Sequence, residues 1–277
     1  SYERVTPGEN YYNSIINSHR CYSGINNSSK KLCRDFLETF INYKKFPLTK
    51  FETLRDCESA KIIENSYRAL NIAFIDEWVK FSNQIGLNLN HILRSIRLRE
   101  THNNIMNPGI GVGGYCLTKD PKFSEISSKI IYKNKIKFPL SISSLRINNN
   151  MINTSIDFIK KKIKIYSKKI LIIGATYKED VGDFRESPSI SLGKKLLKMG
   201  GRVELFDPYI KTEKFKGFKI CKNLKKSDFD IYLMTVKHKE FRKIKFNYKK
   251  NCKIFDLCNF FDKQNQLNTR IHKLGDQ

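Results

Sequence analysis

The spacing of apolar residues changes at about residue 166, and this change limits the possible fold more than any other feature. Before that point apolar positions recur at helical spacing; after it, short apolar runs alternate with helical segments. The runs that predict strands are 169–175, 202–206, 230–236 and 253–256. Strands that alternate with helices predict a parallel α/β sheet, whose ligands bind at the carboxyl ends of the strands. Those ends carry 174–178, Asp207, 236–238 and Asp256.

The first part of the chain predicts helices instead. The longest helical pattern covers 56–86, where Gly86 suits the end of a helix. Further helical patterns are 88–97, 120–133 and 139–165. Residues 1–45 predict only two helices and a short strand, which is too little for a domain. The predicted fold class is therefore α/β, with a helical middle region before a parallel-sheet domain.

A glycine-rich stretch at 107–121 carries the residues most suggestive of chemistry. Glycines crowd one side of Cys116, and Lys119 and Asp120 follow within one helical turn. Glycine lets a ligand approach main-chain N–H groups closely, and a nearby lysine and helix start are surroundings that activate a thiol. The stretch predicts a nucleophile beside a bound anionic substrate. The alternative is a cysteine that only fills space, and the loop by itself does not decide between the two.

The composition narrows the class of protein. The net charge is +25, which suits either an anionic small substrate or phosphate contacts with nucleic acid. The lysines are spread along the chain, which favours the small substrate over nucleic acid. Seven cysteines without a C-x-x-C pair argue against a disulfide framework and against a structural zinc site. We expect reduced thiols in a cytoplasmic protein with no metal, no leader and no membrane-spanning segment.

Four segments together resemble the UDP-glucose/GDP-mannose dehydrogenase family, which are NAD-dependent nucleotide-sugar 6-dehydrogenases. The stretch GIGVGGYCLTKD is similar to the family's cysteine motif, and SAKIIENSYRALNIAFIDE is similar to its central helix. The segment ILIIGATYKEDVGDFRESPSI resembles the motif that opens the C-terminal domain. Residues 3–8 resemble the P-E-R-V-x-P-G of the branch that acts on N-acetylhexosamines. All four come in the family's order and spacing.

The resemblance implies a division of the chain. Residues 1–45 are expected to be the end of an NAD-binding domain, 46–165 a helical central domain that pairs two copies through the long helix, and 166–277 a Rossmann-like domain that binds a UDP-sugar. The family's NAD-binding domain opens with a strand and G-x-G-x-x-G. Nothing similar precedes Ser1. We therefore expect the main NAD site to lie outside this chain.

The family oxidises the C6 alcohol of a nucleotide-linked sugar to a carboxylate and reduces two NAD in turn. The resemblance assigns the nucleophile to Cys116, which would hold the intermediate as a thiohemiacetal and then as a thioester that water hydrolyses. It places Lys61 and Asn65 at the reacting carbon, and their spacing puts them on one helix face. Asp120 would order a water or balance Lys61, and Glu3 would assist hydrolysis.

The resemblance also implies a substrate site made of two stretches. Its expected members are Gly111, Gly113, Gly114, Tyr115, Tyr177, Lys178 and Arg185, the last also near the cofactor. Two departures from the family put the substrate affinity in question. His102 stands in a stretch where relatives carry a sugar-binding arginine, and Cys258 stands where they carry another arginine. Residues 3–5 favour a UDP-N-acetylhexosamine, whereas Lys119 before Asp120 is more like the UDP-glucose branch.

Three functions remain open on the sequence alone. The first is a nucleotide-sugar dehydrogenase that binds a UDP-sugar but does not turn over without an NAD domain. The second is a dimerisation or sugar-binding module that has lost its chemistry, against which the retained Cys116, Lys61, Asn65 and Asp120 speak. The third is a basic nucleic-acid binder, which the spread of the lysines does not favour.

Overall fold

The chain forms two compact units. The computed structural model describes residues 1–8, 10–224, 228–244, 246, 248–261 and 271–276. Residues 1–67 and 123–136 make up the first unit, and residues 68–122 and 137–277 the second. Their boundary falls inside one long helix, α3 (Leu54–Ile85). These units differ from the three domains implied by the resemblance, whose boundaries stay a prediction.

The first unit contains a small apolar core and a two-stranded parallel sheet. Its strands are β1 (Cys21–Tyr22) and β2 (Thr49–Lys50). Its helices are α1 (Tyr11–Ile16), α2 (Asn27–Glu38), α5 (Phe123–Ile130) and the first half of α3. Helix α2 begins at a capping box, in which Asn26 and Ser29 each bond the other's backbone N–H. An apolar cluster in this unit buries Tyr22, Leu37 and Ile41.

The second unit begins with helices. The second half of α3 is followed by α4 (Leu89–Ile96) and later by α6 (Pro139–Lys160). Helix α6 opens at a proline, as predicted, but ends before residue 165, because Ile165 packs into the core of the sheet instead. The helix predicted at 120–133 is a 3₁₀ turn, η2 (Asp120–Lys122), followed by α5, which ends at Ile130.

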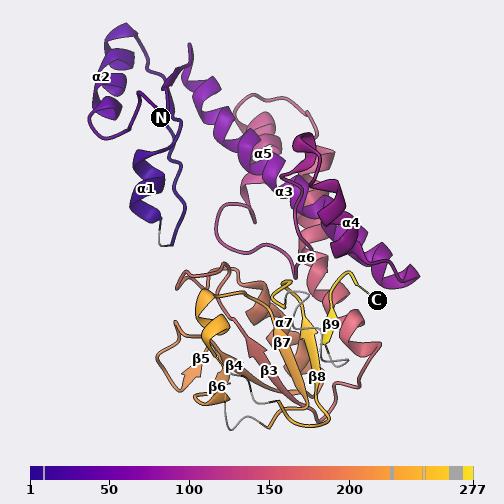
Figure 1. Ribbon diagram of the computed structural model, residues 1–277. Helices are drawn as coiled ribbons and strands as arrows, with labels where there is room; N and C mark the ends of the chain where they lie inside the picture. The colour runs from indigo at the N-terminus through magenta and orange to yellow at the C-terminus, as the bar shows by residue number, and fades with distance from the viewer. Residues whose placement is uncertain (9, 225–227, 245, 247, 262–270, 277) are drawn as a thin grey trace. The chain divides into compact units, whose positions relative to one another are not determined.

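A mostly parallel sheet makes up much of the second unit (Figure 1). Its strands are β3 (Lys169–Ile173), β4 (Arg202–Phe206), β5 (Lys214–Phe215), β6 (Phe218–Ile220), β7 (Ile231–Met234), β8 (Lys253–Asp256) and β9 (Ile271–Lys273). Their order among the described residues is β5-β6-β4-β3-β7-β8-β9, and only the β5–β6 pair is antiparallel. The predicted parallel α/β sheet is confirmed. Strands β5, β6 and β9 were not predicted, because two or three residues are too few for a periodic pattern.

Both faces of the sheet are buried, as expected of parallel strands. Along β3, Ile170 and Ile172 join the core that includes α6 and α7 (Pro188–Lys198), whereas Leu171 and Ile173 join a second core. Strand β3 pairs with β4 on one side and with β7 on the other. The strand order therefore reverses at β3 and β7, and open α/β sheets bind ligands at the carboxyl ends of such strands.

Candidate active site

The glycine-rich stretch forms an irregular loop of the second unit, between η1 (Glu100–His102) and η2. Gly111 and Gly114 have φ angles of 101° and 81°, in the left-handed region that favours glycine. Gly109, Gly111 and Gly114 have the spacing of a dinucleotide-binding turn. Such a turn follows a strand, and in the described part of the chain no strand precedes this loop within the second unit. The loop therefore lacks the strand–turn–helix setting of a dinucleotide-binding fingerprint.

This loop packs against the residues that follow β3. The Gly114 N–H donates to the Arg185 carbonyl oxygen at 3.0 Å. A Cβ on Gly114 would lie 2.8 Å from the Tyr177 ring, and a Cβ on Gly113 would lie 2.9 Å from Pro188 and from Tyr177. Larger residues are excluded at both positions by these neighbours. The two stretches expected to bind substrate are thus brought together within the second unit.

Cys116 is exposed and stands at the start of a tight turn. Its carbonyl oxygen accepts the N–H groups of Lys119 at 3.1 Å and Asp120 at 2.9 Å, so Asp120 lies one turn after the thiol, as its spacing predicts. The Lys119 ammonium lies 2.7 Å from the buried Asp120 carboxylate, and this hydrogen bond raises the pKa of Lys119. Lys119 and Arg185 both carry charges that interact with Cys116 and lie 4.5 and 5.8 Å from the centre of the Tyr115 ring.

The loop after β3 adds further charge to this region. Burial lowers the pKa of Lys178, and the nearby Arg68 of α3 lowers it further because the two charges repel. The exposed Arg185 guanidinium donates to the Asp183 carboxylate at 2.6–3.1 Å, and this pairing lowers the pKa of Asp183. Burial also raises the pKa of Tyr177. Sequence reasoning did not predict Arg68 in this cationic group.

A buried polar network fixes the start of the same loop. The His238 ring is fully buried; its Nδ1 accepts the Asp180 N–H at 2.8 Å. Because Nδ1 accepts, Nε2 carries the proton, and it faces the Thr176 hydroxyl at 3.1 Å and the Asp207 carboxylate at 3.3 Å. Asp207 also accepts the Ala175 N–H at 2.6 Å. The carboxyl ends of β3, β4 and β7 meet here, as the sequence predicts.

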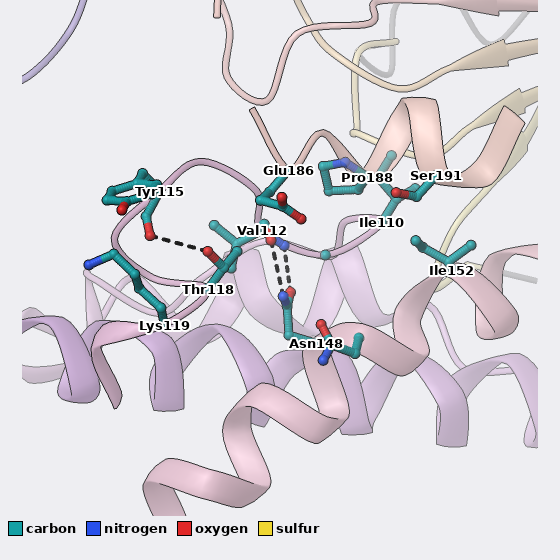
Figure 2. Close-up of a pocket in the computed structure, with 12 residues that line it drawn as sticks. Ile110, Val112, Tyr115, Thr118, Lys119, Asn148, Ile152, Glu186, Pro188 and Ser191 are labelled. Carbon is teal, nitrogen blue, oxygen red and sulfur yellow. Dashed lines mark hydrogen bonds between the residues drawn. The ribbon is translucent and has the colours of Figure 1, made fainter. Parts of the chain in front are cut away.

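Asn148 of α6 binds the glycine loop directly (Figure 2). Its side chain accepts the Val112 N–H at 2.6 Å and donates to the Val112 carbonyl oxygen at 3.0 Å. A cavity of about 410 Å³ opens beside this contact, and the predicted substrate residues Gly111 and Tyr115 line it together with Lys119. The sequence did not single out Asn148, because an asparagine within an amphipathic helix is usually a solvent-exposed residue.

Three predicted catalytic residues belong to the first unit. The Lys61 ammonium donates to the Glu3 carbonyl oxygen at 3.1 Å. Asn65 follows on α3, four residues after Lys61, and is buried. Cys116 lies in the second unit. The joint action of these residues on one carbon therefore stays a prediction.

The two departures from the family also have defined surroundings. His102 is exposed at the end of η1, and its Nδ1 lies 2.8 Å from the Thr101 hydroxyl. Cys258 lies in the turn that follows β8. The buried Asp256 carboxylate accepts hydrogen bonds from backbone N–H groups of this turn, among them that of Phe260 at 2.8 Å. A sugar-binding role for His102 stays a prediction.

Comparison with known proteins gives two matches to family models. The model described as "UDP-glucose/GDP-mannose dehydrogenase family, central domain" matches residues 55–150. The model described as "UDP-glucose/GDP-mannose dehydrogenase family, UDP binding domain" matches residues 171–263. Both matches follow the order that the sequence motifs predict.

Individual relatives agree with these matches. A UDP-N-acetyl-D-mannosamine dehydrogenase from Methanococcus maripaludis is 34% identical over 88% of this chain and 54% of its own length. A UDP-N-acetyl-D-glucosamine 6-dehydrogenase from Salmonella typhi is 28% identical over 87% of this chain and 57% of its own. The solved UDP-N-acetyl-mannosamine dehydrogenase of Staphylococcus aureus is similar at 27% identity and a TM-score of 0.79, over 99% of this chain and 62% of that one.

This chain thus spans about half the length of the curated relatives that it matches. In the described part of the chain, no helix has the length and apolar character needed to cross a membrane.

Proposed function

This chain belongs to the UDP-glucose/GDP-mannose dehydrogenase family, and we propose that it binds a UDP-N-acetylhexosamine and presents Cys116 to the sugar's C6. The overall reaction would be the NAD-dependent oxidation of the C6 alcohol to a carboxylate. The observation that carries the proposal is the loop around Cys116, which leaves the thiol exposed and packs against Tyr177 and Arg185. The names of the relatives and the motif at residues 3–8 favour the N-acetylhexosamine over glucose.

The glycine loop at 107–121 does not have the setting of a dinucleotide-binding turn. The glycine loop lacks a strand before it in the second unit, and a Cβ on Gly174, which follows β3, would lie 2.6 Å from Val236. A residue larger than glycine is therefore excluded at position 174 by Val236. The part proposed for this chain is to hold the UDP-sugar and to form the covalent bond. Without a dinucleotide site from elsewhere, the chain would not turn over.

The chemistry at Cys116 would be addition to an aldehyde. The Sγ atom forms a bond to C6, the carbonyl π pair moves to oxygen, and the thiol proton passes to that oxygen through solvent. The product is a thiohemiacetal. Lys119 and Arg185 carry positive charge whose interaction reaches Cys116. Lys61 and Asn65 are proposed donors to the developing oxyanion.

The direct test of substrate binding is titration calorimetry of the chain with UDP-N-acetylmannosamine and, in parallel, UDP-glucose. We expect saturable binding of the first, and weaker binding of the second. No heat from either at about millimolar concentration, where free energies of binding near −4 kcal/mol still register, would contradict the proposal. Arg68→Gln should weaken binding, since it removes one charge from the group around Lys178.

We also propose that the chain forms a homodimer through α3. Within the second unit the helix exposes Phe74, Trp78, Phe81 and Ile85, at 51%, 42%, 44% and 55%. Their spacing places them on one face of the helix, and Trp78 touches both Phe74 and Phe81 edge-on, with ring centres at 6.4 and 5.6 Å. An exposed apolar face of this kind on a helix suits the same face of a second copy.

Sedimentation velocity tests the dimer. We expect a dimer at about micromolar concentration and a monomer for Trp78→Glu, because the charge would be buried without a partner. Lys80→Glu, an exposed charge change two residues on, is the matched control and should leave the dimer intact. A monomeric parent chain, or equal dissociation of both variants, contradicts this interface.

A further inference from the structure

We propose that Asn148 is the positioning residue that fixes the shape of the glycine loop and thereby the placement of Cys116. Only the catalytic role of Cys116 rests on the proposed function; the loop contact itself does not. Asn148 is 8% exposed, and its amide makes a two-point contact with one residue of the loop, Val112. Figure 2 shows both bonds running from α6 to the loop.

The glycine at position 111 makes room for the contact between Asn148 and Val112. Gly111 precedes Val112 and has φ of 101°, and a Cβ there would lie 2.9 Å from the Asn148 Oδ1 and 3.1 Å from the Asn148 carbonyl oxygen. Glycine at 111 therefore lets α6 approach closely enough for both bonds. Cys116 lies four residues after Val112. Because so few residues separate the two, fixing Val112 limits the positions that the backbone at Cys116 can take.

The far end of the loop is fixed independently. The Gly114 N–H bonds to Arg185, and the Thr118 hydroxyl donates to the Gly114 carbonyl oxygen at 2.9 Å. These contacts hold Gly114 and Thr118, and Asn148 holds Val112 at the start of the same loop, so both anchors together place Cys116. Within the described residues, the Asn148 amide is the side chain that bonds both polar groups of Val112.

An asparagine is required here by hydrogen-bond chemistry. The side chain must accept from an N–H and donate to a carbonyl oxygen at the same residue, and a planar amide offers both at the right separation. A carboxylate in its place would keep the first bond but set its second oxygen against the Val112 carbonyl oxygen. A protonated carboxyl would restore both bonds, because its O–H donates and its C=O accepts.

The test compares Asn148→Asp with Asn150→Asp, two isosteric changes on one helix. Asn150 is exposed, and its side-chain oxygen accepts the amide N–H of its helix neighbour Asn153 at 2.9 Å. Lys119 and Glu186 line the cavity beside the loop and are unchanged in both variants. The measurement is amide hydrogen exchange of the peptide that covers 107–118, corrected for the intrinsic rate, at about pH 8 and about pH 5.

We expect Asn148→Asp to speed exchange in this peptide by about tenfold at about pH 8 and to return it toward the parent rate at about pH 5, where the buried carboxyl regains its proton. Asn148→Ala should speed exchange at both pH values, and Asn150→Asp at neither. A purely structural role of Asn148 would lower the stability of the whole unit without this local, pH-reversible effect.

Two outcomes overturn the inference: parent-like exchange of 107–118 in Asn148→Asp at high pH, or equal acceleration in Asn150→Asp. If Asn148→Asp fails to fold at high pH, its refolding at about pH 5 supports the inference. Failure at both pH values, with Asn148→Ser folded and its loop protected, overturns it. No ligand is present, so a failed sugar titration of the parent chain would count against the proposed function alone.

Discussion

The loop around Cys116 and the surroundings of Lys61 are built in different ways. In the second unit, buried polar side chains hold the loops: Asn148 binds one and His238 the other, and both are nine-tenths or more buried. In the first unit, Lys61 makes an exposed bond to Glu3, and the unit's apolar cluster buries three residues. The difference teaches that side chains within the second unit fix the loop that carries Cys116. The proposed partner residue Lys61, in contrast, belongs to a unit with a small apolar cluster.

The second unit also carries an unpaired buried acid. Asp76 of α3 is 2% exposed, burial raises its pKa to about 8, and its Oδ2 has no hydrogen-bond partner in the described part of the chain. In the unfolded chain an aspartate titrates near 3.9. Between these values the folded state holds a proton that the unfolded state has lost. Stability from this group is therefore present at acidic pH and is lost as the pH rises toward 8.

The largest expected effect follows from this acid. From about pH 5 to about pH 8, Asp76 should lower the free energy of unfolding by about 4 kcal/mol, at about 1.4 kcal/mol per pH unit. Asp76→Asn should remove this slope, and urea unfolding across the pH range measures it. Asp157→Asn, at an exposed position of α6, is the control. Parallel pH profiles for the parent and Asp76→Asn would show that Asp76 ionises freely.

The next effect tests the small core of the first unit. Leu37→Ala should cost about 3 kcal/mol, since it empties a buried leucine site in a cluster of three. Because that core is separate from the sheet, limited proteolysis should cut residues 1–67 early and leave the second unit intact. Leu32→Ala, on the same helix at 68% exposure, should change little. Simultaneous loss of both units would show that they unfold as one.

A smaller effect is expected at His238. His238→Leu should cost about 2 kcal/mol, since the Asp180 N–H loses its acceptor and Asp207 loses a donor. UDP-sugar binding should weaken by about tenfold, because the loop that carries Lys178 loses its support. His272→Leu, a half-buried histidine of β9, is the matched control. Unchanged binding in a folded His238→Leu chain would show that this network is not needed for the site.

The sequence predicted the parts of the molecule that local chemistry determines. The change in the spacing of apolar residues near 166 predicted the sheet. Because the carboxyl ends of parallel strands lie at one edge of a sheet, the sequence also predicted that Asp207 and His238 lie close together, as their contact confirms. The sequence could not predict that Val112 bonds Asn148, because this contact joins positions 36 residues apart. Nor could it predict that Arg68 joins the group around Lys178, since a lone exposed arginine on a helix has no distinguishing pattern.

The most direct test of the central claim is to supply the aldehyde that Cys116 is proposed to capture. The C6 aldehyde of a UDP-N-acetylhexosamine, labelled with ¹³C at C6, is mixed with the chain without NAD and observed by carbon NMR. The account predicts a thiohemiacetal carbon signal that Cys116→Ser abolishes and that Cys33→Ser, at a half-buried cysteine, retains. A spectrum with only free and hydrated aldehyde, or an adduct that survives Cys116→Ser, would contradict it.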